Sequence, residues 1–206
     1  MNRTSKSKKW FQDHINDPYV QAAKAAGYRS RASYKLVEMQ EKYNIIKQRD
    51  SVCDLGSTPG GWSEQAIKWV GPKGTVIACD LIAMDPIPKV QFTQGDFTTI
   101  ETQQNLKDSN NGKPYDVVLS DMAPDTIGHQ ATDQIRSIAM AEAVLEFCQT
   151  NLSLEGKCLI KVFQGIGFDD LIKNYRKTFK NIYVKKPQSS KSKSKEVYIY
   201  AIGLKS

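Results

Sequence analysis

Residues 51–62 read Ser-Val-Cys-Asp-Leu-Gly-Ser-Thr-Pro-Gly-Gly-Trp, and this stretch decides the fold. Residues 51–55 are largely apolar and predict a buried strand, and a helical pattern begins at Trp62. The glycine-rich turn between them is typical of a strand that passes into a helix, where the backbone can approach a ligand closely. The turn matches neither the G-x-G-x-x-G fingerprint nor the G-K-[ST] of a P-loop, so on its own it also fits a simple tight loop.

Two helical stretches precede this turn, and strands and helices alternate from residue 51 onward. Helices are predicted at 18–26, 32–44, 62–70, 132–151 and 168–178, and strands at 51–55, 75–79, 90–93, 116–120, 158–163, 181–185 and 196–204. Alternation of this kind predicts an α/β domain whose sheet is mostly parallel, with seven strands and with helices on both faces. No helix fits between the last two strands, so they predict an antiparallel C-terminal hairpin. The apolar face of the 132–151 helix is predicted to comprise Ile135, Ile138, Ala141, Leu145 and Cys148.

Charge is distributed unevenly along the 206 residues, whose net charge is +7. Residues 1–50 carry 11 Lys and Arg against 5 Asp and Glu, and residues 173–206 carry 10 against 1, whereas residues 51–172 carry 8 against 16. Two basic ends predict a polyanionic partner, with ordinary solvated surface as the alternative. Residues 1–17 are interpreted as a basic flexible arm and residues 18–206 as a single domain.

The sequence predicts a cytoplasmic protein with neither a membrane span nor a metal site. No apolar run approaches the roughly 18–20 residues of a membrane-spanning helix, and the N-terminus lacks the apolar stretch of a secretory signal. The four cysteines, Cys53, Cys79, Cys148 and Cys158, form no C-x-x-C pair and are accompanied by only two histidines. They are therefore expected to be reduced, buried thiols.

Acidic residues stand at the ends of successive predicted strands. Asp80 follows Asp54 by 26 residues, and Asp96 lies in Gln94-Gly95-Asp96-Phe97. Ligands of open α/β sheets bind outside the carboxyl ends of the strands, so Asp80 is a candidate acceptor for ribose hydroxyls. Asp96 is a candidate acceptor for an adenine amino group, with Phe97 against the ring. Each aspartate alone also fits a helix cap or a turn former.

Charged residues also interrupt segments that otherwise read as buried strands. Lys161 lies in Leu-Ile-Lys-Val-Phe, Glu196 precedes Val-Tyr-Ile-Tyr-Ala-Ile, and Asp121 follows Val-Val-Leu-Ser. An unpaired buried charge is costly, so these residues are expected to share a cleft, with a structural ion pair as the alternative. Lys161 is then a candidate general base. Lys35 is a candidate second base nearby, although a helix lysine is by default solvated.

These segments together resemble the FtsJ/RrmJ family of RNA ribose 2′-O-methyltransferases, most closely its bacterial branch that modifies large-subunit (23S) ribosomal RNA. The resemblance runs from about residue 10 to 204 and rests on nine motifs. They are 30–36, 54–56, 59–63, 78–81, 84–86, 94–97, 120–124, 161–165 and the basic run before Glu196-Val197-Tyr198. It implies a Rossmann-like class I methyltransferase fold, S-adenosyl-L-methionine as cofactor with S-adenosyl-L-homocysteine as product, and a monomer that acts in the cytoplasm.

The resemblance also implies the site residues. The family's catalytic tetrad falls on Lys35, Asp121, Lys161 and Glu196. Lys161 would be the base or would orient the hydroxyl, Asp121 and Lys35 would set its charge and position, and Glu196 would hold Lys161 in place. The implied cofactor-binding residues are Gly56, Pro59, Gly60, Gly61, Trp62, Asp80, Leu81, Asp96, Phe97 and Asp121. The chain departs from the family at Asp125, where Asn is usual, which adds negative charge near the expected path of RNA.

The implied substrate is a uridine ribose in 23S ribosomal RNA, within the large subunit or its precursor, with a role in ribosome maturation. A tRNA anticodon loop remains an alternative because the tetrad does not distinguish the two. A non-catalytic RNA-binding assembly factor is a second alternative, and a small-molecule methyltransferase is a third that leaves the basic ends unexplained. Aromatic residues among the N-terminal charges could stack an RNA base or pack into the core; they are Trp10, Phe11, Tyr19 and Tyr28.

Overall fold

The computed structural model describes residues 17–124, 130–191 and 193–205. Six helices lie in these ranges, with bounds α2 Pro18–Ala25, α3 Ser33–Tyr43, α4 Gly61–Val70, α5 Ile100–Ser109, α6 Gln130–Asn151 and α7 Phe168–Thr178. The strands are β1 Ser51–Leu55, β2 Thr75–Asp80, β3 Val90–Gln94, β4 Tyr115–Ser120, β5 Leu152–Phe163, β6 Phe179–Lys185 and β7 Glu196–Leu204. No helix of the described ranges is both long and apolar enough to cross a membrane.

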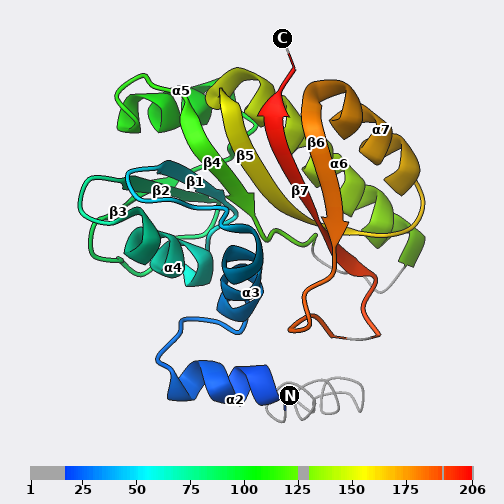
Figure 1. The fold of residues 1–206 in the computed structure, drawn as a ribbon, viewed down its shortest axis with the longest axis horizontal. Coiled ribbons are helices and arrows are strands. Elements are labelled where there is room, and N and C mark those ends of the chain that lie inside the picture. Colours follow the sequence, from blue (N-terminus) through cyan, green and yellow to red (C-terminus); the bar gives the residue numbers. More distant parts are fainter. Residues whose placement is uncertain (1–16, 125–129, 192, 206) are drawn as a thin grey trace, which may run out of the picture.

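The strands form one seven-stranded sheet in the order β3-β2-β1-β4-β5-β7-β6 (Figure 1). β1 to β5 pair in parallel, and β7 runs antiparallel to both of its neighbours, β5 and β6. The predicted α/β class, the mostly parallel sheet and the C-terminal hairpin are confirmed. β7, the last strand in the sequence, is inserted between two strands that precede it.

Helices cover both faces of the sheet, so the chain has two hydrophobic cores. One core joins the sheet to α5, α6 and α7 and includes Phe147 and Tyr175, whereas the other joins it to α3 and α4 and includes Leu36 and Trp62. Successive strand residues alternate between these faces, as the two-residue period of a strand requires. Leu159, two residues before Lys161, packs in the α3–α4 core, which places Lys161 on that face.

The structure departs from the predicted elements at three places. α5 was not predicted, because its sequence IETQQNLKDS contains one buried apolar residue, Leu106, and therefore shows no apolar stripe. β5 begins at Leu152, six residues before the predicted start. The assignment of Ile135 to the buried face of α6 was wrong, since it is 56% exposed. At that end of the helix the inward positions are polar: Gln134 donates to the carbonyl of Gln164, and Ser137 accepts from the N–H of Phe163.

All four cysteines are buried and free, as expected for reduced thiols. Burial, with smaller contributions from Asp80 and Asp96, raises the pKa of Cys79 to about 12, so its thiol stays protonated at physiological pH. Within the described ranges no group of three or more His, Cys, Asp or Glu residues is arranged to hold a metal ion.

Candidate active site

The structure brings Lys35, Asp121, Lys161 and Glu196 together at the carboxyl edge of the central strands. Lys35 lies in the first turn of α3, Asp121 directly follows β4, Lys161 is in β5, and Glu196 begins β7. The Lys161 ammonium lies 3.2 Å from an Asp121 carboxylate oxygen and also donates to the Asp121 backbone carbonyl. The Lys35 ammonium lies 3.7 Å from the same oxygen of Asp121 and 2.9 Å from Glu196. Opposite charges therefore compensate one another in this mostly buried group.

The expectation that Glu196 holds Lys161 was wrong. Glu196 instead binds Lys35, whose ammonium contacts its two carboxylate oxygens at 2.9 and 3.0 Å. The register between β5 and β7 gives the reason, because it places Tyr198 opposite Lys161 and Glu196 opposite Phe163. α3 packs over the same face and brings Lys35 to Glu196.

Tyr198 is a functional candidate that the sequence analysis missed. Its hydroxyl donates a hydrogen bond of 2.6 Å to the Asp121 carboxylate, and its ring lies 5.9 Å from that of Trp62. Burial, together with the charges of Asp121 and Glu196, raises the pKa of Tyr198 well above its ordinary value, so the hydroxyl remains a donor. A signal was available, because Tyr198 follows Glu196 by two residues and so shares its strand face.

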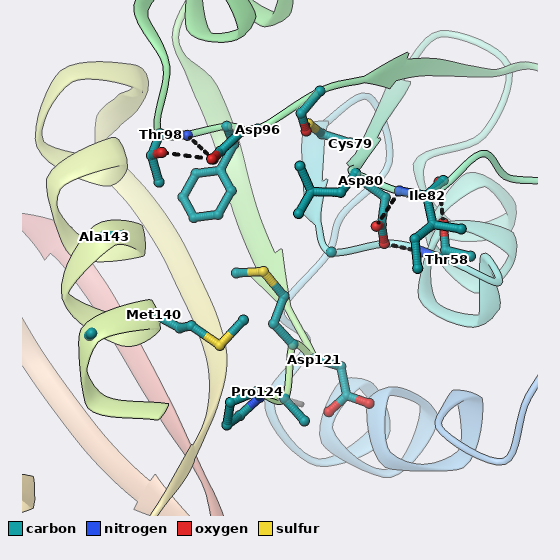
Figure 2. Close-up of a pocket in the computed structure, with 17 residues that line it drawn as sticks. Thr58, Cys79, Asp80, Ile82, Asp96, Thr98, Asp121, Pro124, Met140 and Ala143 are labelled. Atoms are coloured by element: carbon teal, nitrogen blue, oxygen red, sulfur yellow. Dashed lines mark hydrogen bonds between the residues drawn. The ribbon is translucent and has the colours of Figure 1, made fainter. Parts of the chain in front are cut away.

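A cavity of about 580 Å³ lies beside this group, between the ends of β1, β2, β3 and β4 and the helix α6. Figure 2 shows Met140 and Ala143 on one wall, Asp80 and Ile82 on the opposite wall, and Asp96 and Asp121 at its two ends. Its volume falls in the range of small-molecule and cofactor sites, roughly 300–1,000 Å³. Six of the ten residues predicted to bind the cofactor line it: Gly56, Asp80, Leu81, Asp96, Phe97 and Asp121.

The two cavity aspartates also organise their own loops. Asp80 accepts hydrogen bonds from the N–H groups of Thr58 and Ile82, at 2.8 and 3.0 Å (Figure 2). Asp96 accepts from the N–H and the hydroxyl of Thr98, at 2.9 and 2.7 Å. Each aspartate therefore forms a turn and also faces the cavity. The role of turn former and the role of candidate ligand acceptor are thus compatible.

The other four predicted cofactor residues, Pro59, Gly60, Gly61 and Trp62, lie beside this cavity and do not line it. The glycines have a packing role. Gly60 adopts a φ of +98°, and a Cβ on Gly61 would come within 2.4 Å of the Ser30 hydroxyl. Trp62 is buried and donates from its indole nitrogen to the carbonyl of Ala32, at 2.8 Å. These contacts pack the turn tightly against residues 30–32, which precede α3.

A second, small cavity of about 50 Å³ connects the turn to the tetrad, and its walls include Asp54, Ser57, Trp62 and Asp121. The Ser57 hydroxyl is buried and has no hydrogen-bond partner among the described residues. Asp54 is buried and accepts a hydrogen bond of 2.6 Å from Ser63. Its burial raises its pKa to about 7. Ser57 was not predicted as a site residue, although it lies in the glycine-rich turn. Ile82, Met122 and Met140 of the larger cavity were not predicted because none belongs to a recognisable pattern of charge or glycine.

Some predicted residues have other surroundings or lie outside the described residues. Tyr19 and Tyr28 both pack against the Tyr34 ring, with centroids 5.5 and 5.2 Å away, and both are partly exposed. Trp10, Phe11 and Asp125 lie outside the described residues, as does the arm up to residue 16. Asp17, assigned to that arm, is buried, caps α2 and pairs with Arg31.

Comparison with known proteins shows the family. The profile of the FtsJ-like methyltransferases matches residues 28–204. The chain belongs to this family. The protein named ribosomal RNA large subunit methyltransferase E from Francisella philomiragia is 48% identical over 205 residues and is matched over the full length of both chains. The protein of the same name from Francisella tularensis subsp. holarctica is 46% identical, again over the full length of both.

Two solved structures are similar to this chain. A Plasmodium falciparum protein described as a ribosomal RNA methyltransferase matches with a TM-score of 0.76 and 29% identity, over 86% of this chain and 98% of that one. Aeropyrum pernix fibrillarin, solved with S-adenosyl-L-methionine bound, matches with a TM-score of 0.58 and 15% identity, over 85% of this chain and 75% of that one. The second likeness shows the shared Rossmann-like methyltransferase fold.

Proposed function

We propose that this FtsJ-like methyltransferase transfers a methyl group from S-adenosyl-L-methionine to a uridine ribose 2′-hydroxyl of 23S ribosomal RNA, in the large subunit or its precursor. The observation that carries the proposal is the tetrad. Two lysines and two carboxylates, contributed by α3, the residue after β4, β5 and β7, meet next to a cavity of cofactor size. Asp121 belongs to both, because it lines the cavity and contacts both lysines. The names and full-length identity of the Francisella relatives support the choice of ribosomal RNA.

The larger cavity suits the proposed cofactor. Asp80 and Asp96, at the ends of β2 and β3, offer carboxylate oxygens to ribose hydroxyls and an adenine amino group, and Phe97, Leu81 and Ile82 offer apolar contacts. The Ser57 hydroxyl, which has no partner within the described part of the chain, offers a polar group near Asp121. When bound, S-adenosyl-L-methionine supplies an electrophilic methyl group on a positively charged sulfur. A cavity with several carboxylates in its walls is electrostatically suited to that positive charge.

The chain's own residues would position the RNA hydroxyl. Lys161 orients the ribose 2′-hydroxyl and, after releasing one proton of its own ammonium, receives the proton of that hydroxyl as the oxygen attacks the methyl carbon. Asp121 and Tyr198 fix Lys161 through the Asp121 carboxylate. Glu196 acts one step away, because it holds Lys35 beside Asp121. Much of the rate is expected from alignment, since holding two reacting groups in the right geometry alone can remove roughly 7–11 kcal/mol of a barrier.

The substrate test compares RNA from cells with and without the gene. Mass spectrometry of 23S ribosomal RNA from a deletion strain should show one missing ribose methyl group, restored by the intact gene and not by Lys161→Ala. Purified protein should then methylate large subunits from the deletion strain and leave tRNA unmodified. Unchanged ribosomal RNA together with a missing methyl group in tRNA would move the activity to the anticodon loop. No missing methyl group in either RNA, together with no binding of S-adenosyl-L-methionine, would favour the non-catalytic assembly factor.

A further inference from the structure

The Ser- and Lys-rich connection between β6 and β7 is fastened to the helix that carries Lys35. Glu38 of α3 accepts hydrogen bonds from the N–H groups of Gln188 and Ser189, at 2.8 and 3.2 Å, and from the Ser189 hydroxyl at 3.2 Å. Arg31 donates to the Ser189 carbonyl at 2.6 Å. In Figure 1 this connection lies at the edge of the sheet where α3 begins. Its position relative to the tetrad is therefore fixed by three hydrogen bonds to α3 and one to Arg31, just before that helix.

Ser190, the next residue of this connection, contacts the tetrad directly. Its hydroxyl donates a hydrogen bond of 2.8 Å to a carboxylate oxygen of Glu196, and the residue is only 7% exposed. The same Glu196 oxygen lies 2.9 Å from the Lys35 ammonium. Glu196 is thus held between a buried hydroxyl on one side and the lysine on the other.

We propose that Ser190 is a positioning residue for methyl transfer, whose hydroxyl keeps the Glu196 carboxylate in the orientation that holds Lys35 beside Asp121. The proposal rests on the proposed function of the tetrad. A glutamate has three side-chain torsions, and a second, fixed hydrogen bond restricts them. Without the Ser190 hydroxyl, Glu196 can turn away, and Lys35 then loses the partner that keeps it 3.7 Å from Asp121.

The neighbouring serine supplies a matched control. Ser189 is 2% exposed and comes from the same turn, yet its hydroxyl bonds to Glu38. Ser189→Ala removes one of three bonds to Glu38 and leaves both backbone bonds in place. A general effect of weakening the loop should therefore be at least as visible in Ser189→Ala, whereas an effect through Glu196 belongs to Ser190 alone.

The experiment measures steady-state methylation of large ribosomal subunits from the deletion strain by Ser190→Ala, Ser190→Thr, Ser190→Cys, Ser189→Ala and Lys161→Ala. We expect Ser190→Ala to lower kcat about tenfold, the effect of losing one hydrogen bond to a charged group, with unchanged KM for RNA and unchanged calorimetric affinity for S-adenosyl-L-methionine. Ser190→Cys keeps the side chain's approximate size but is a weak hydrogen-bond donor, so we expect a similar fall in kcat. This variant provides the test if Ser190→Ala folds poorly. Ser190→Thr keeps the hydroxyl and should recover most of the rate, and Ser189→Ala should stay within twofold of wild type.

Normal kcat in both Ser190→Ala and Ser190→Cys would overturn the proposal, and so would an equal loss in Ser189→Ala. Lys161→Ala separates this failure from a failure of the proposed function. If Lys161→Ala is inactive while the Ser190 variants are normal, only the role of Ser190 is lost. If Lys161→Ala remains active, the proposed function of the tetrad itself falls.

Discussion

Asp121 holds Lys161 twice, through a carboxylate oxygen 3.2 Å from the ammonium and through its backbone carbonyl, which accepts a hydrogen bond from the same nitrogen. A single residue at the end of β4 therefore fixes the amine of β5 at the carboxyl edge of the sheet. Substitution of Asp121 would remove the carboxylate contact and leave the backbone carbonyl in place. The contribution of the carboxylate can therefore be measured separately from that of the Lys161 amine.

Replacement of Lys161 by Met should abolish methyl transfer and leave the cofactor site intact. Met keeps most of the aliphatic stem and removes the amine, so a fall in kcat of at least 100-fold is expected for the loss of a general base. Lys161 does not line the 580 Å³ cavity, so calorimetry should give an unchanged affinity for S-adenosyl-L-methionine. Turnover within tenfold of wild type would exclude the proposed role.

Replacement of Asp80 by Ala should weaken cofactor binding and leave kcat nearly unchanged, the reverse of the effect expected for Lys161→Met. Asp80 lines the cavity and holds the N–H groups of Thr58 and Ile82, so its loss removes a ligand contact and loosens two loops. We expect cofactor affinity to fall at least tenfold by calorimetry, with kcat near wild type at saturating cofactor. Asp108→Ala is the control, because Asp108 is an exposed α5 residue that contacts Gln104. Equal affinities in the two variants would remove Asp80 from the site.

Asp54 should make stability fall as the pH rises. Burial raises its pKa from 3.8 to about 7, so the native state binds this proton more tightly than the unfolded state does. Its contribution to stability is then complete below about pH 4 and is lost as the pH rises to about 7. Asp54→Asn keeps an acceptor for Ser63 and removes the titration, so it should gain up to a few kcal/mol over wild type between pH 4 and pH 8. Urea unfolding at both pH values checks this, and a pH-independent difference would contradict it.

The exposed lysines of the β6–β7 connection should contribute to RNA affinity through charge. Lys193 and Lys195 are exposed and lie in the most basic part of the chain. A double reversal to Glu should weaken RNA binding and reduce the slope of log affinity against log salt by roughly 1.5, the value for two lost phosphate contacts. Lys113→Glu, on the exposed turn before β4, is the control. The same slope for the double variant and the control would place the RNA elsewhere.

Site residues that interrupt the regular pattern of apolar and polar residues could be predicted from sequence. Site residues that fit that pattern could not. Lys161 and Glu196 are conspicuous because charge in an apolar strand is costly, and Asp80 and Asp96 because they end successive strands. The structure places all four at the predicted edge of the sheet. Tyr198 and Ser190 went unnoticed, since a tyrosine in a strand and a serine in a loop are ordinary.

The sequence also could not show which side chains that are distant along the chain pair with each other. Whether Glu196 binds Lys35 or Lys161 depends on the register of β7 against β5 and on how α3 packs over the sheet. Neither is set by local propensity. The helix α5 escaped prediction for a related reason, because Leu106 is its one fully buried apolar residue and its periodicity is correspondingly weak.

The insertion of β7 between β5 and β6 has a consequence for biosynthesis. Until β7 has been synthesised, β5 and β6 cannot pair with the strand that lies between them, and Lys35 lacks its partner Glu196, which lies 161 positions later in the sequence. Such long-range closure is slow compared with local folding. A nascent chain is therefore catalytically silent until β7 has been synthesised, and a truncation that removes residues 195–206 should leave no active fragment.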